Sequence, residues 1–302
     1  MAVHNEEKII GKTLASLIAL PYANYEIVIG LDGCTDKTEE VVKYFMIKSD
    51  KIRYFRLNLR SGKPAVIDAI IKNASGDIIV INDADWIFKV DNPASFNRLF
   101  SVFDREDIGG IAESFPVEWD EYNMKNSNFG YKMVAHSTFL WLEYQKEKMT
   151  YKKEDLVYLS TPTMFLTNIF RKSLYKKNIS LGDDFERTKN IMDAGYKVII
   201  FDEPSVPRMI AAYDTIKIKD LIKQKIRTAI ARRQLNRMDI ANMTVFGYYL
   251  PATWFILKRG WKNGPYIWSA VTLWVIITSL GELVSKFKKS DTLGGWALRA
   301  ER

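Results

Sequence analysis

Cysteine and histidine are scarce in this chain of 302 residues, which has one cysteine, Cys34, and two histidines, His4 and His136. A single cysteine excludes an internal disulfide framework and is typical of proteins that work in a reducing compartment. The scarcity of both residue types also argues against a zinc site and against a Cys/His nucleophile. Catalysis by a zinc-bound water or by a thiolate is therefore not expected.

Several sequence motifs are also absent. No G-x-x-x-x-G-K-[ST] segment occurs, which excludes P-loop chemistry. None of the common nucleic-acid-binding motifs is found. The chain passes from Met1 into the polar run of residues 4–7, so a secretory signal is not expected at this end.

Positive charge is in excess, with a formal net charge of +8 at pH 7. Such an excess is typical of proteins that bind nucleic acid, anionic lipid or phosphorylated ligands. Nearly every third residue in the range 217–237 is basic, and this run lies just before an apolar C-terminal region. Its position favours lipid headgroups, so we expect a membrane partner and no nucleic acid.

The first two thirds of the chain alternate strand-like and helix-like patterns. Buried strands are predicted at residues 26–31, 51–57 and 77–81, with helices between them at 36–45 and 63–74. This order, with short polar turns, predicts right-handed βαβ units on a parallel sheet, and hence an α/β fold. Ligands bind beyond the carboxyl ends of such strands, where Asp32, Asp83 and Asp85 are found.

The pattern after residue 105 is less regular. A strand-like patch covers residues 109–115, and an aromatic, helix-compatible stretch covers 129–144. An acidic turn, a helix and a strand at 197–201 follow. We assign residues 1–214 as a whole to one α/β domain.

The C-terminal part has two apolar stretches, residues 240–257 and 266–284, each close to the ~20 residues that span a bilayer. We therefore expect a basic amphipathic interfacial helix at 215–239, a two-helix transmembrane hairpin at 240–285 and a basic cytoplasmic tail at 286–302. The charge distribution around the hairpin places the α/β domain on the cytoplasmic side. Two alternatives stay open: a pair of buried helices packed on the domain, and a hairpin that only dips into the bilayer.

Two carboxylates follow the predicted strand at 77–81. Asp83 and Asp85 are spaced i and i+2, so both can reach one hard cation, directly or through water. A Mg²⁺ or Mn²⁺ ion that binds only one or two protein carboxylates keeps positions free for substrate phosphates. The ion would stabilise a departing diphosphate. The alternative is a pair of solvated turn residues.

Two further residues are candidates for binding a nucleotide. Asp32 closes an earlier strand, and its carboxylate can accept a hydrogen bond from the ring N–H of a nucleobase. Lys63 stands at a glycine-marked turn into a helix, where the helix N-terminus and the ammonium together suit a phosphate. The alternatives are the acid of an Asp-Gly turn for Asp32 and a surface lysine for Lys63.

The order of these motifs along the chain resembles the inverting glycosyltransferase family 2, over residues 2 to about 285. The motifs that carry the resemblance are His4-Asn5-Glu6-Glu7, Asp32-Gly33-Cys34-Thr35-Asp36, Gly62-Lys63, Asp83-Ala84-Asp85, Gly182-Asp183-Asp184 and Gln224-Lys225-Ile226-Arg227. The last motif resembles the Q-x-x-R-W motif of a membrane-attached branch that includes ceramide glucosyltransferase and the cellulose, chitin and hyaluronan synthases. The resemblance implies the GT-A fold, a Rossmann-like mixed sheet that binds a nucleotide-diphospho-sugar.

The resemblance also implies roles for individual residues. Asp184 is the expected general base, and Asp183 orients it or binds the acceptor. Asp83 and Asp85 bind the metal, and Gln224 and Arg227 contact the diphosphate or the acceptor. The residues expected to bind the nucleotide are Ala2, His4, Glu6, Asp32, Lys63 and Asp83.

Simpler interpretations of the later motifs remain. Asp183 and Asp184 can be the N-cap acids of a helix at 185–194. Gln224 and Arg227 can lie on a solvated or headgroup-facing helix surface. A hydroxyl acceptor, however, must lose its proton as it attacks the anomeric carbon, and a carboxylate that takes this proton contributes ~10² to 10⁴ in rate.

The sequence departs from the family pattern at three places. The chain begins at the end of the family's first strand, which leaves open whether the sheet edge and the base pocket near residues 2–6 are complete. Thr228 stands in place of the tryptophan of Q-x-x-R-W, which argues against processive polymer synthesis. The acidic pair is Asp-Asp rather than Glu-Asp, which is a mild chemical change.

The expected function is metal-dependent, inverting transfer of a sugar from a UDP- or GDP-sugar to a hydroxyl of a lipid-linked or membrane-associated acceptor. One alternative is a polyprenyl-phosphate sugar synthase similar to dolichyl-phosphate mannose synthase, whose acceptor is already an anion. Another is a catalytically silent subunit that anchors a membrane complex. Loss of activity in Asp184→Asn would favour the hydroxyl acceptor over the polyprenyl phosphate.

Overall fold

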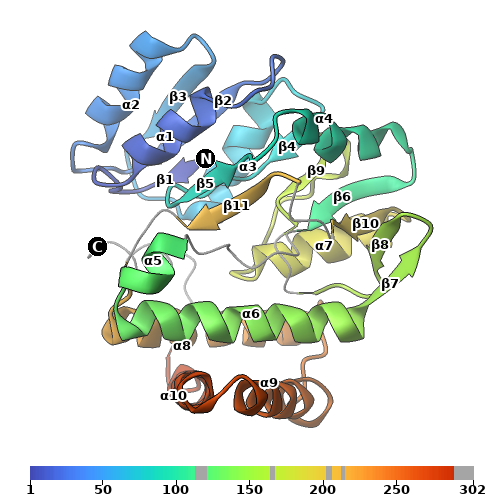
Figure 1. Cartoon of the computed structure of the whole chain (residues 1–302). Coiled ribbons are helices and arrows are strands. Elements are labelled where there is room, and N and C mark those ends of the chain that lie inside the picture. Colours follow the sequence, from blue (N-terminus) through green and yellow to red (C-terminus); the bar gives the residue numbers. More distant parts are fainter. Residues whose placement is uncertain (113–120, 164–166, 202–205, 212–214, 289–302) are drawn as a thin grey trace.

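The computed structural model describes residues 1–112, 121–163, 167–201, 206–211 and 215–288. The expectations for residues 113–115 and for the tail beyond 288 lie outside this part of the chain. Strands and their covering helices form the upper portion of the molecule in Figure 1, and long helices form the lower portion.

The N-terminal unit is a parallel three-stranded sheet with helices between its strands. The strands β1 (Ala2–Val3), β2 (Ile27–Asp32) and β3 (Ile52–Leu57) pair in the order β1-β2-β3. The helices are α1 (Ile10–Ile18), α2 (Thr38–Lys48) and α3 (Lys63–Asn73). The expected parallel βαβ arrangement is confirmed for these strands.

Strand β2 is buried along its whole length because helices cover both of its faces. Ile29 packs in the same cluster as Leu14 of α1, whereas Val28 packs in the cluster of α3 with Val66. Gly30 is required here, because a Cβ at this position would lie 2.5 Å from Cγ1 of Val66. The side chains of α3 therefore press directly onto the strand that ends at Asp32.

The second sheet is mixed and has six strands in the order β4-β9-β6-β10-β8-β7. Its members are β4 (Ile78–Val80), β6 (Ile108–Ala112), β7 (Thr150–Lys153), β8 (Leu156–Leu159), β9 (Ile169–Arg171) and β10 (Lys197–Ile200). β6 and β10 are parallel, but β4 runs antiparallel to β9. The expectation of a parallel partner for the strand near residue 80 was wrong, because the partner lies far along the chain and the local pattern carries no information about its direction.

A short ribbon and the helices up to residue 193 follow. β5 (Trp86–Lys89) pairs antiparallel with β11 (Arg208–Ala211). The helices are α4 (Ala94–Ser101), α5 (Glu121–Asn126), α6 (Phe129–Met149) and α7 (Asp183–Asp193), with 3₁₀ turns at Val102–Asp104 and Lys172–Leu174. The polar turn between β4 and β5 carries the Asp83-Ala84-Asp85 motif.

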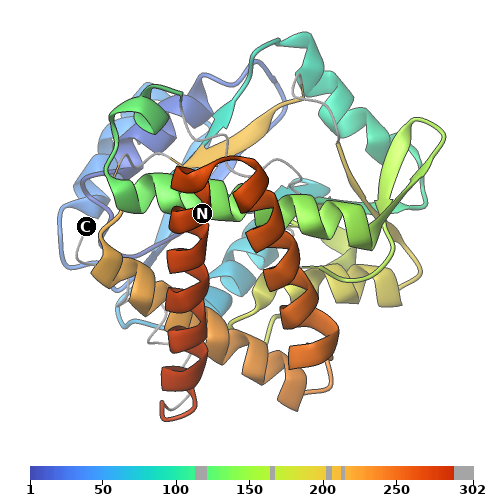
Figure 2. The same ribbon diagram turned by 60° about the horizontal axis from the view of Figure 1, so that its bottom comes forward.

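The lower portion consists of α6 together with α8 (Ile218–Arg237), α9 (Leu250–Lys262) and α10 (Pro265–Ser285), and a π-helical turn at Val245–Tyr249 precedes α9. Figure 2 shows α9 and α10 side by side, lying across α6 and α8. Ala270, Val271 and Trp274 of α10 share a hydrophobic cluster with Tyr131 and Met133 of α6. Packing is therefore continuous between the α/β domain and residues 250–285.

The expected transmembrane pair at 240–285 stays a prediction, and the two helices found there differ in length. Helix α9 has 13 residues, about 20 Å of helix, which is shorter than a hydrocarbon core of about 30 Å, and the π-helical turn Val245–Tyr249 runs directly into it. Among the helices that the structure describes, only α10 is long and apolar enough to cross a bilayer, judged by length and composition. The hairpin buries one face on α6 and α8 and exposes the other.

Candidate functional site

The Asp83-Ala84-Asp85 turn is fixed by hydrogen bonds from both of its sides. The Asn82 amide donates to the carbonyls of Asp83, at 2.8 Å, and Trp86, at 2.9 Å. The Thr13 hydroxyl of α1 donates to the Ala84 carbonyl at 2.5 Å. Asp85 is buried, and the Asp83 side chain keeps 26% exposure. The two carboxylates are therefore held on a rigid turn, with Asp83 the more accessible.

Lys63 places its ammonium against this turn. It is the first residue of α3, after Gly62, whose φ of +84° favours glycine. Nζ of Lys63 lies 2.8 Å from Oδ1 and 3.2 Å from Oδ2 of Asp83. Burial lowers the pKa of Lys63, but the carboxylates of Asp83, Asp183 and Asp184 outweigh this effect and raise it overall. Lys63 is thus a cation at the end of the sheet, in contact with Asp83.

Asp32 anchors the turn that precedes Lys63. Its fully buried carboxylate accepts hydrogen bonds from the backbone N–H groups of Ser61, at 2.6 Å, and Gly62, at 2.9 Å. A ring nitrogen of His4 lies 2.5 Å from the Asp32 carbonyl oxygen. The Asp32 carboxylate therefore fixes the backbone of the turn before Lys63, a role that the sequence did not reveal. Its contact with a nucleobase stays a prediction.

Ala2 and Glu6 lie beside this anchor. Ala2 is buried in β1 opposite Gly30, so its backbone is the part that a nucleotide could contact. The Glu6 backbone N–H donates to the Thr38 hydroxyl at 2.8 Å, and the Glu6 carbonyl accepts from Ile10 at the start of α1. The expected nucleotide residues near the chain start therefore share one edge of the sheet with Asp32.

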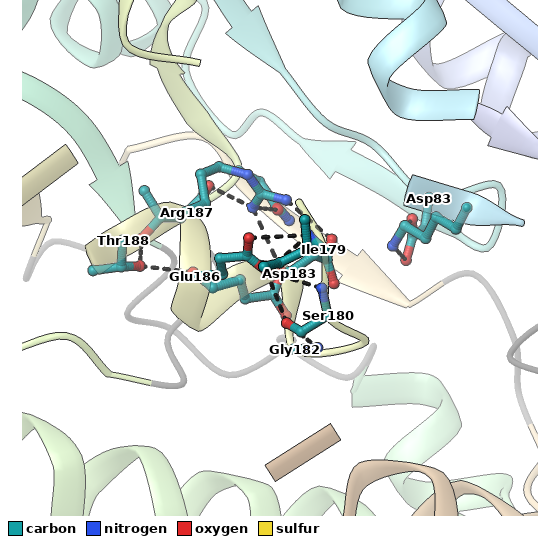
Figure 3. A network of polar contacts seen from close by, with 12 residues as sticks. Asp83, Ile179, Ser180, Gly182, Asp183, Glu186, Arg187 and Thr188 are labelled. Atoms are coloured by element: carbon teal, nitrogen blue, oxygen red, sulfur yellow. Dashed lines mark hydrogen bonds and ion pairs between the residues drawn. The ribbon is translucent and has the colours of Figure 1, made fainter. Parts of the chain in front are cut away.

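Asp183 and Asp184 form the first turn of α7, and both contact Arg187 of the same helix. Figure 3 shows Asp183 and Arg187. Arg187 is 3.0 Å from the Asp183 carboxylate and 3.5 Å from that of Asp184, and only 3% of its side chain is exposed. It also donates to the Thr167 carbonyl at 2.8 Å. Sequence reasoning missed Arg187, although the i, i+4 spacing from Asp183 is a recognisable signal for an ion pair.

The pKa of Asp184 is raised to about 7. Burial is the largest cause and the neighbouring Asp183 carboxylate is the second, while Arg187 and Lys63 act in the opposite direction. Its side chain keeps 25% exposure, so a substrate can reach it. A carboxylate whose pKa lies near neutral pH suits a general base, since it accepts a proton readily yet is ionised for much of the time.

The structure thus brings together residues that are far apart in the sequence. The pKa of Asp184 responds to Lys63 and Asp83, and that of Lys63 to Asp183 and Asp184. Figure 3 shows Asp83 across from the turn that carries Asp183. One cation and three carboxylates, from the start of α3, the β4–β5 turn and α7, therefore face one region.

The donor set at Asp83 and Asp85 suits a hard cation. Within the residues that the structure describes, no group of three or more Asp, Glu, His or Cys side chains could enclose a metal. Two carboxylates alone match Mg²⁺ or Mn²⁺, which take oxygen ligands and keep positions for substrate phosphates. Both carboxylate oxygens of Asp83 already lie within hydrogen-bond distance of the Lys63 ammonium, so a metal there would share this carboxylate with Lys63.

Gln224 and Arg227 are half-buried on α8. The residue between them, Lys225, places its ammonium 4.1 Å from the ring centroid of Trp274, so this part of α8 packs on α10. The expected contact of Gln224 and Arg227 with the diphosphate or acceptor stays a prediction. Farther along α8, Gln234 and Leu235 contact the turn before Asp183.

Comparison with known proteins identifies the family and the fold. A family model described as Glycosyl transferase family 2 matches residues 1–177, which end before Asp183. Poly-beta-1,6-N-acetyl-D-glucosamine synthases of Staphylococcus epidermidis (strain RP62A) and Staphylococcus aureus (strain COL) are 32% and 34% identical over 93 residues. This match covers 31% of the chain and 22% of each relative, less than a quarter of their length.

A solved structure resembles nearly the whole chain. It is that of a mannosyltransferase from Pyrobaculum calidifontis in complex with GDP-Man and Mn²⁺. The TM-score is 0.59 and the identity 17%, and the match covers 94% of this chain and 86% of the other. At this identity the likeness shows the fold alone, and it confirms the expected GT-A fold.

Proposed function

Because this chain belongs to glycosyltransferase family 2, we propose that it moves a sugar, with inversion, from a UDP- or GDP-sugar to a hydroxyl group. The acceptor in this proposal is lipid-linked or membrane-associated. Asp184 is the general base, Asp83 and Asp85 hold a divalent metal, and Lys63 contacts the diphosphate. The observation that carries the proposal is the convergence of Lys63 and Asp83 with a carboxylate of near-neutral pKa, Asp184.

The proposed chemistry is a single displacement. The acceptor oxygen forms a bond to the anomeric carbon of the donor while the bond from that carbon to the diphosphate oxygen breaks. The hydroxyl proton passes to the Asp184 carboxylate. Negative charge grows on the diphosphate, and Lys63, with N–H donors beyond those that face Asp83, can bind it. A metal held at Asp83 and Asp85 would supply further positive charge to the same leaving group.

The nucleotide-binding residues in this proposal are those at the sheet edge, namely Ala2, His4, Glu6, Asp32, Lys63 and Asp83. Carboxylates there can accept from uracil or from the donor edge of guanine, so both nucleotides remain candidates. The related synthases named above make a polymer of N-acetylglucosamine, and the structural neighbour binds GDP-Man. Gln224 and Arg227 are proposed to contact the diphosphate or the acceptor, and Asp183 to orient the base.

A donor screen tests this proposal. In the presence of Mn²⁺, we expect one class of nucleotide-sugar to raise the melting temperature, because a ligand that binds only the native state stabilises it. At 100 times its Kd the stabilisation is about 2.7 kcal/mol. The measurement is a thermal shift with UDP-N-acetylglucosamine, UDP-glucose and GDP-mannose, with MnCl₂ and with EDTA. No shift with any UDP- or GDP-sugar would contradict the proposed function.

The exposed face of α9 and α10 supports the membrane part of the proposal. Trp254 and Trp261 on α9 are 70% and 67% exposed, and Leu280 and Leu283 on α10 are 52% and 53% exposed. Lys262, at the end of α9, is exposed beside them. Tryptophan, leucine and lysine together are typical of helices that lie in the headgroup region of a bilayer. We propose that the hairpin lies along an anionic membrane surface, with the catalytic domain on the cytoplasmic side.

Charge on this face should abolish membrane binding. We expect the double variant Trp261→Glu/Leu280→Glu to bind anionic vesicles at least about 100-fold more weakly, because burying each apolar side chain is worth about 1.5–3 kcal/mol. The measurement is flotation with phosphatidylglycerol-containing vesicles. The matched control is Ile47→Glu, at an 87% exposed apolar residue of α2, which should float like the parent. Equal flotation of both variants would contradict the proposed surface.

A further inference from the structure

The residues that precede Asp183, 179–182, are called here the base turn, and Glu186 of α7 holds one side of it. The buried Glu186 carboxylate accepts from the backbone N–H of Ile179, at 3.0 Å, and of Ser180, at 3.1 Å. It also accepts from the Ser180 hydroxyl at 2.8 Å (Figure 3). These hydrogen bonds are local, since they join the base turn to α7, the helix that directly follows it.

The other side of the base turn is held by α8. Oε1 of Gln234 accepts from the backbone N–H of Leu181 at 2.9 Å. The buried side chain of Leu235 packs so closely on Gly182 that a Cβ there would lie 2.6 Å from Cδ1 of Leu235. Two consecutive residues of α8 therefore contact the two residues immediately before Asp183.

The end of α8 that makes these contacts is itself fixed. The Asn236 side chain exchanges hydrogen bonds with the backbone of Met243, at 3.0 and 3.1 Å. On the side of α8 toward α10, Arg232 pairs with Glu282. The amide of Gln234 thus projects from a helix that is anchored both to the following turn and to α10.

We propose that Gln234 is a positioning residue for sugar transfer, because its hydrogen bond to Leu181 fixes the base turn and with it the Asp184 carboxylate. The inference rests on the proposed function, in which Asp184 is the base. A side chain far from the reacting atoms can matter in this way, since a misplacement of about 1 Å can cost 10²-fold in rate. Without the Gln234 oxygen, the Leu181 N–H loses its acceptor, which destabilises the present position of the turn.

A loosened base turn would also change the titration of the base. Burial is the largest cause of the raised pKa of Asp184. Water that enters beside a displaced turn would stabilise the carboxylate and lower this pKa. In a plot of transfer rate against pH, the rise on the acidic side, called here the acidic limb, would then move to lower pH. A purely structural role of Gln234, without effect on Asp184, would leave this limb in place.

The test compares two substitutions at one position. Gln234→Met keeps the length of the side chain but removes the acceptor, whereas Gln234→Glu keeps an oxygen that accepts from Leu181. For Gln234→Met we expect kcat to fall by about 10- to 100-fold, with the donor KM within about twofold and the acidic limb at lower pH. For Gln234→Glu we expect kcat within about threefold of the parent. Arg237→Met, at an exposed residue of the same helix, is the control and should match the parent.

Unchanged kcat and an unmoved acidic limb in Gln234→Met would overturn the proposal. Melting temperature and Mn²⁺-dependent donor binding show whether this variant is folded. If it is not, Gln234→Ala provides the same comparison, and a parent-like kcat there would equally overturn the proposal. Asp184→Asn in the same assay tests the proposed base separately from the role of Gln234. If this variant keeps the activity of the parent, Asp184 is not the base, independently of the result for the Gln234 variants.

Discussion

Asp184→Asn should lower the rate of sugar transfer by roughly 10² to 10⁴ and leave donor binding nearly unchanged. The substitution keeps the shape of the side chain but removes the group that accepts the hydroxyl proton. Donor binding should persist because Lys63 and the Asp83 turn are untouched. The measurement is transfer to a lipid extract at saturating donor, together with the donor Kd from calorimetry.

The same variant separates two kinds of acceptor. A polyprenyl phosphate is already ionised at neutral pH and needs no strong base, so its transfer should be far less sensitive to Asp184→Asn. Activity within about threefold of the parent would contradict the hydroxyl acceptor. The raised pKa of Asp184 favours the large loss, because it matches the side chain to proton transfer near pH 7.

The pH dependence gives an independent check on Asp184. Since the base must be ionised, transfer by the parent should rise with pH through about 7, the raised pKa, and then level off. The stability should change in the opposite direction. The pKa of Asp184 in the folded state lies above the ordinary 3.8. Between about pH 4 and pH 7 the native state therefore binds more protons than the unfolded state. The free energy of unfolding consequently falls as the pH rises from about 4 through 7. Asp184→Asn should therefore melt at a higher temperature than the parent at pH 8 and show little difference at pH 4.

Asp85→Ala should weaken Mn²⁺-dependent donor binding by at least about 100-fold. Loss of a residue that only supports a metal ligand already costs about 10- to 100-fold, and loss of a ligand should cost no less. Asp83→Ala should be milder, because Lys63 remains beside the diphosphate and is freed from its ion pair with Asp83. The measurement is calorimetric titration of the donor identified by the thermal-shift screen, with Mn²⁺ and with EDTA.

Two controls make the metal prediction specific. Asp85 is buried, so Asp85→Asn, which fills the same space, distinguishes loss of charge from loss of packing. Asp77→Asn, at an exposed acid that precedes β4, should bind the donor like the parent. Parent-like, Mn²⁺-dependent binding in Asp85→Asn would contradict the assignment of Asp85 to the metal.

Much of the fold and of the site could be predicted from local pattern. The strands ending at Asp32 and before Asp83 were visible as short apolar runs closed by polar turns, and the helix from Lys63 followed a glycine. The acids at strand ends were expected to form one site because parallel strands place their carboxyl ends at one edge, although β4 lies in the second sheet and is antiparallel to its partner. The segment 129–149 was also recognisable as a helix, although it extends five residues beyond the predicted end at 144.

Other features depend on which segments meet. The antiparallel partner of β4 is β9, whose position relative to β4 no local periodicity encodes. Length and hydropathy do not distinguish a helix in lipid from one that packs on α6 and α8, so the sequence left these arrangements of the hairpin open. The burial of Ala270, Val271 and Trp274 on one face of α10 is visible only in three dimensions.

By itself, the sequence determined the α/β class, the family and the residue types available for catalysis, because these follow from motifs of a few residues in a fixed order. Only the tertiary structure decided the ion pair of Lys63 with Asp83, the clamp of the base turn by Gln234 and the near-neutral pKa of Asp184. The physical reason is that desolvation and hydrogen-bond partners depend on which surfaces are in contact. Those contacts join positions more than 50 residues apart in the case of Leu181 and Gln234, a separation that no local pattern spans.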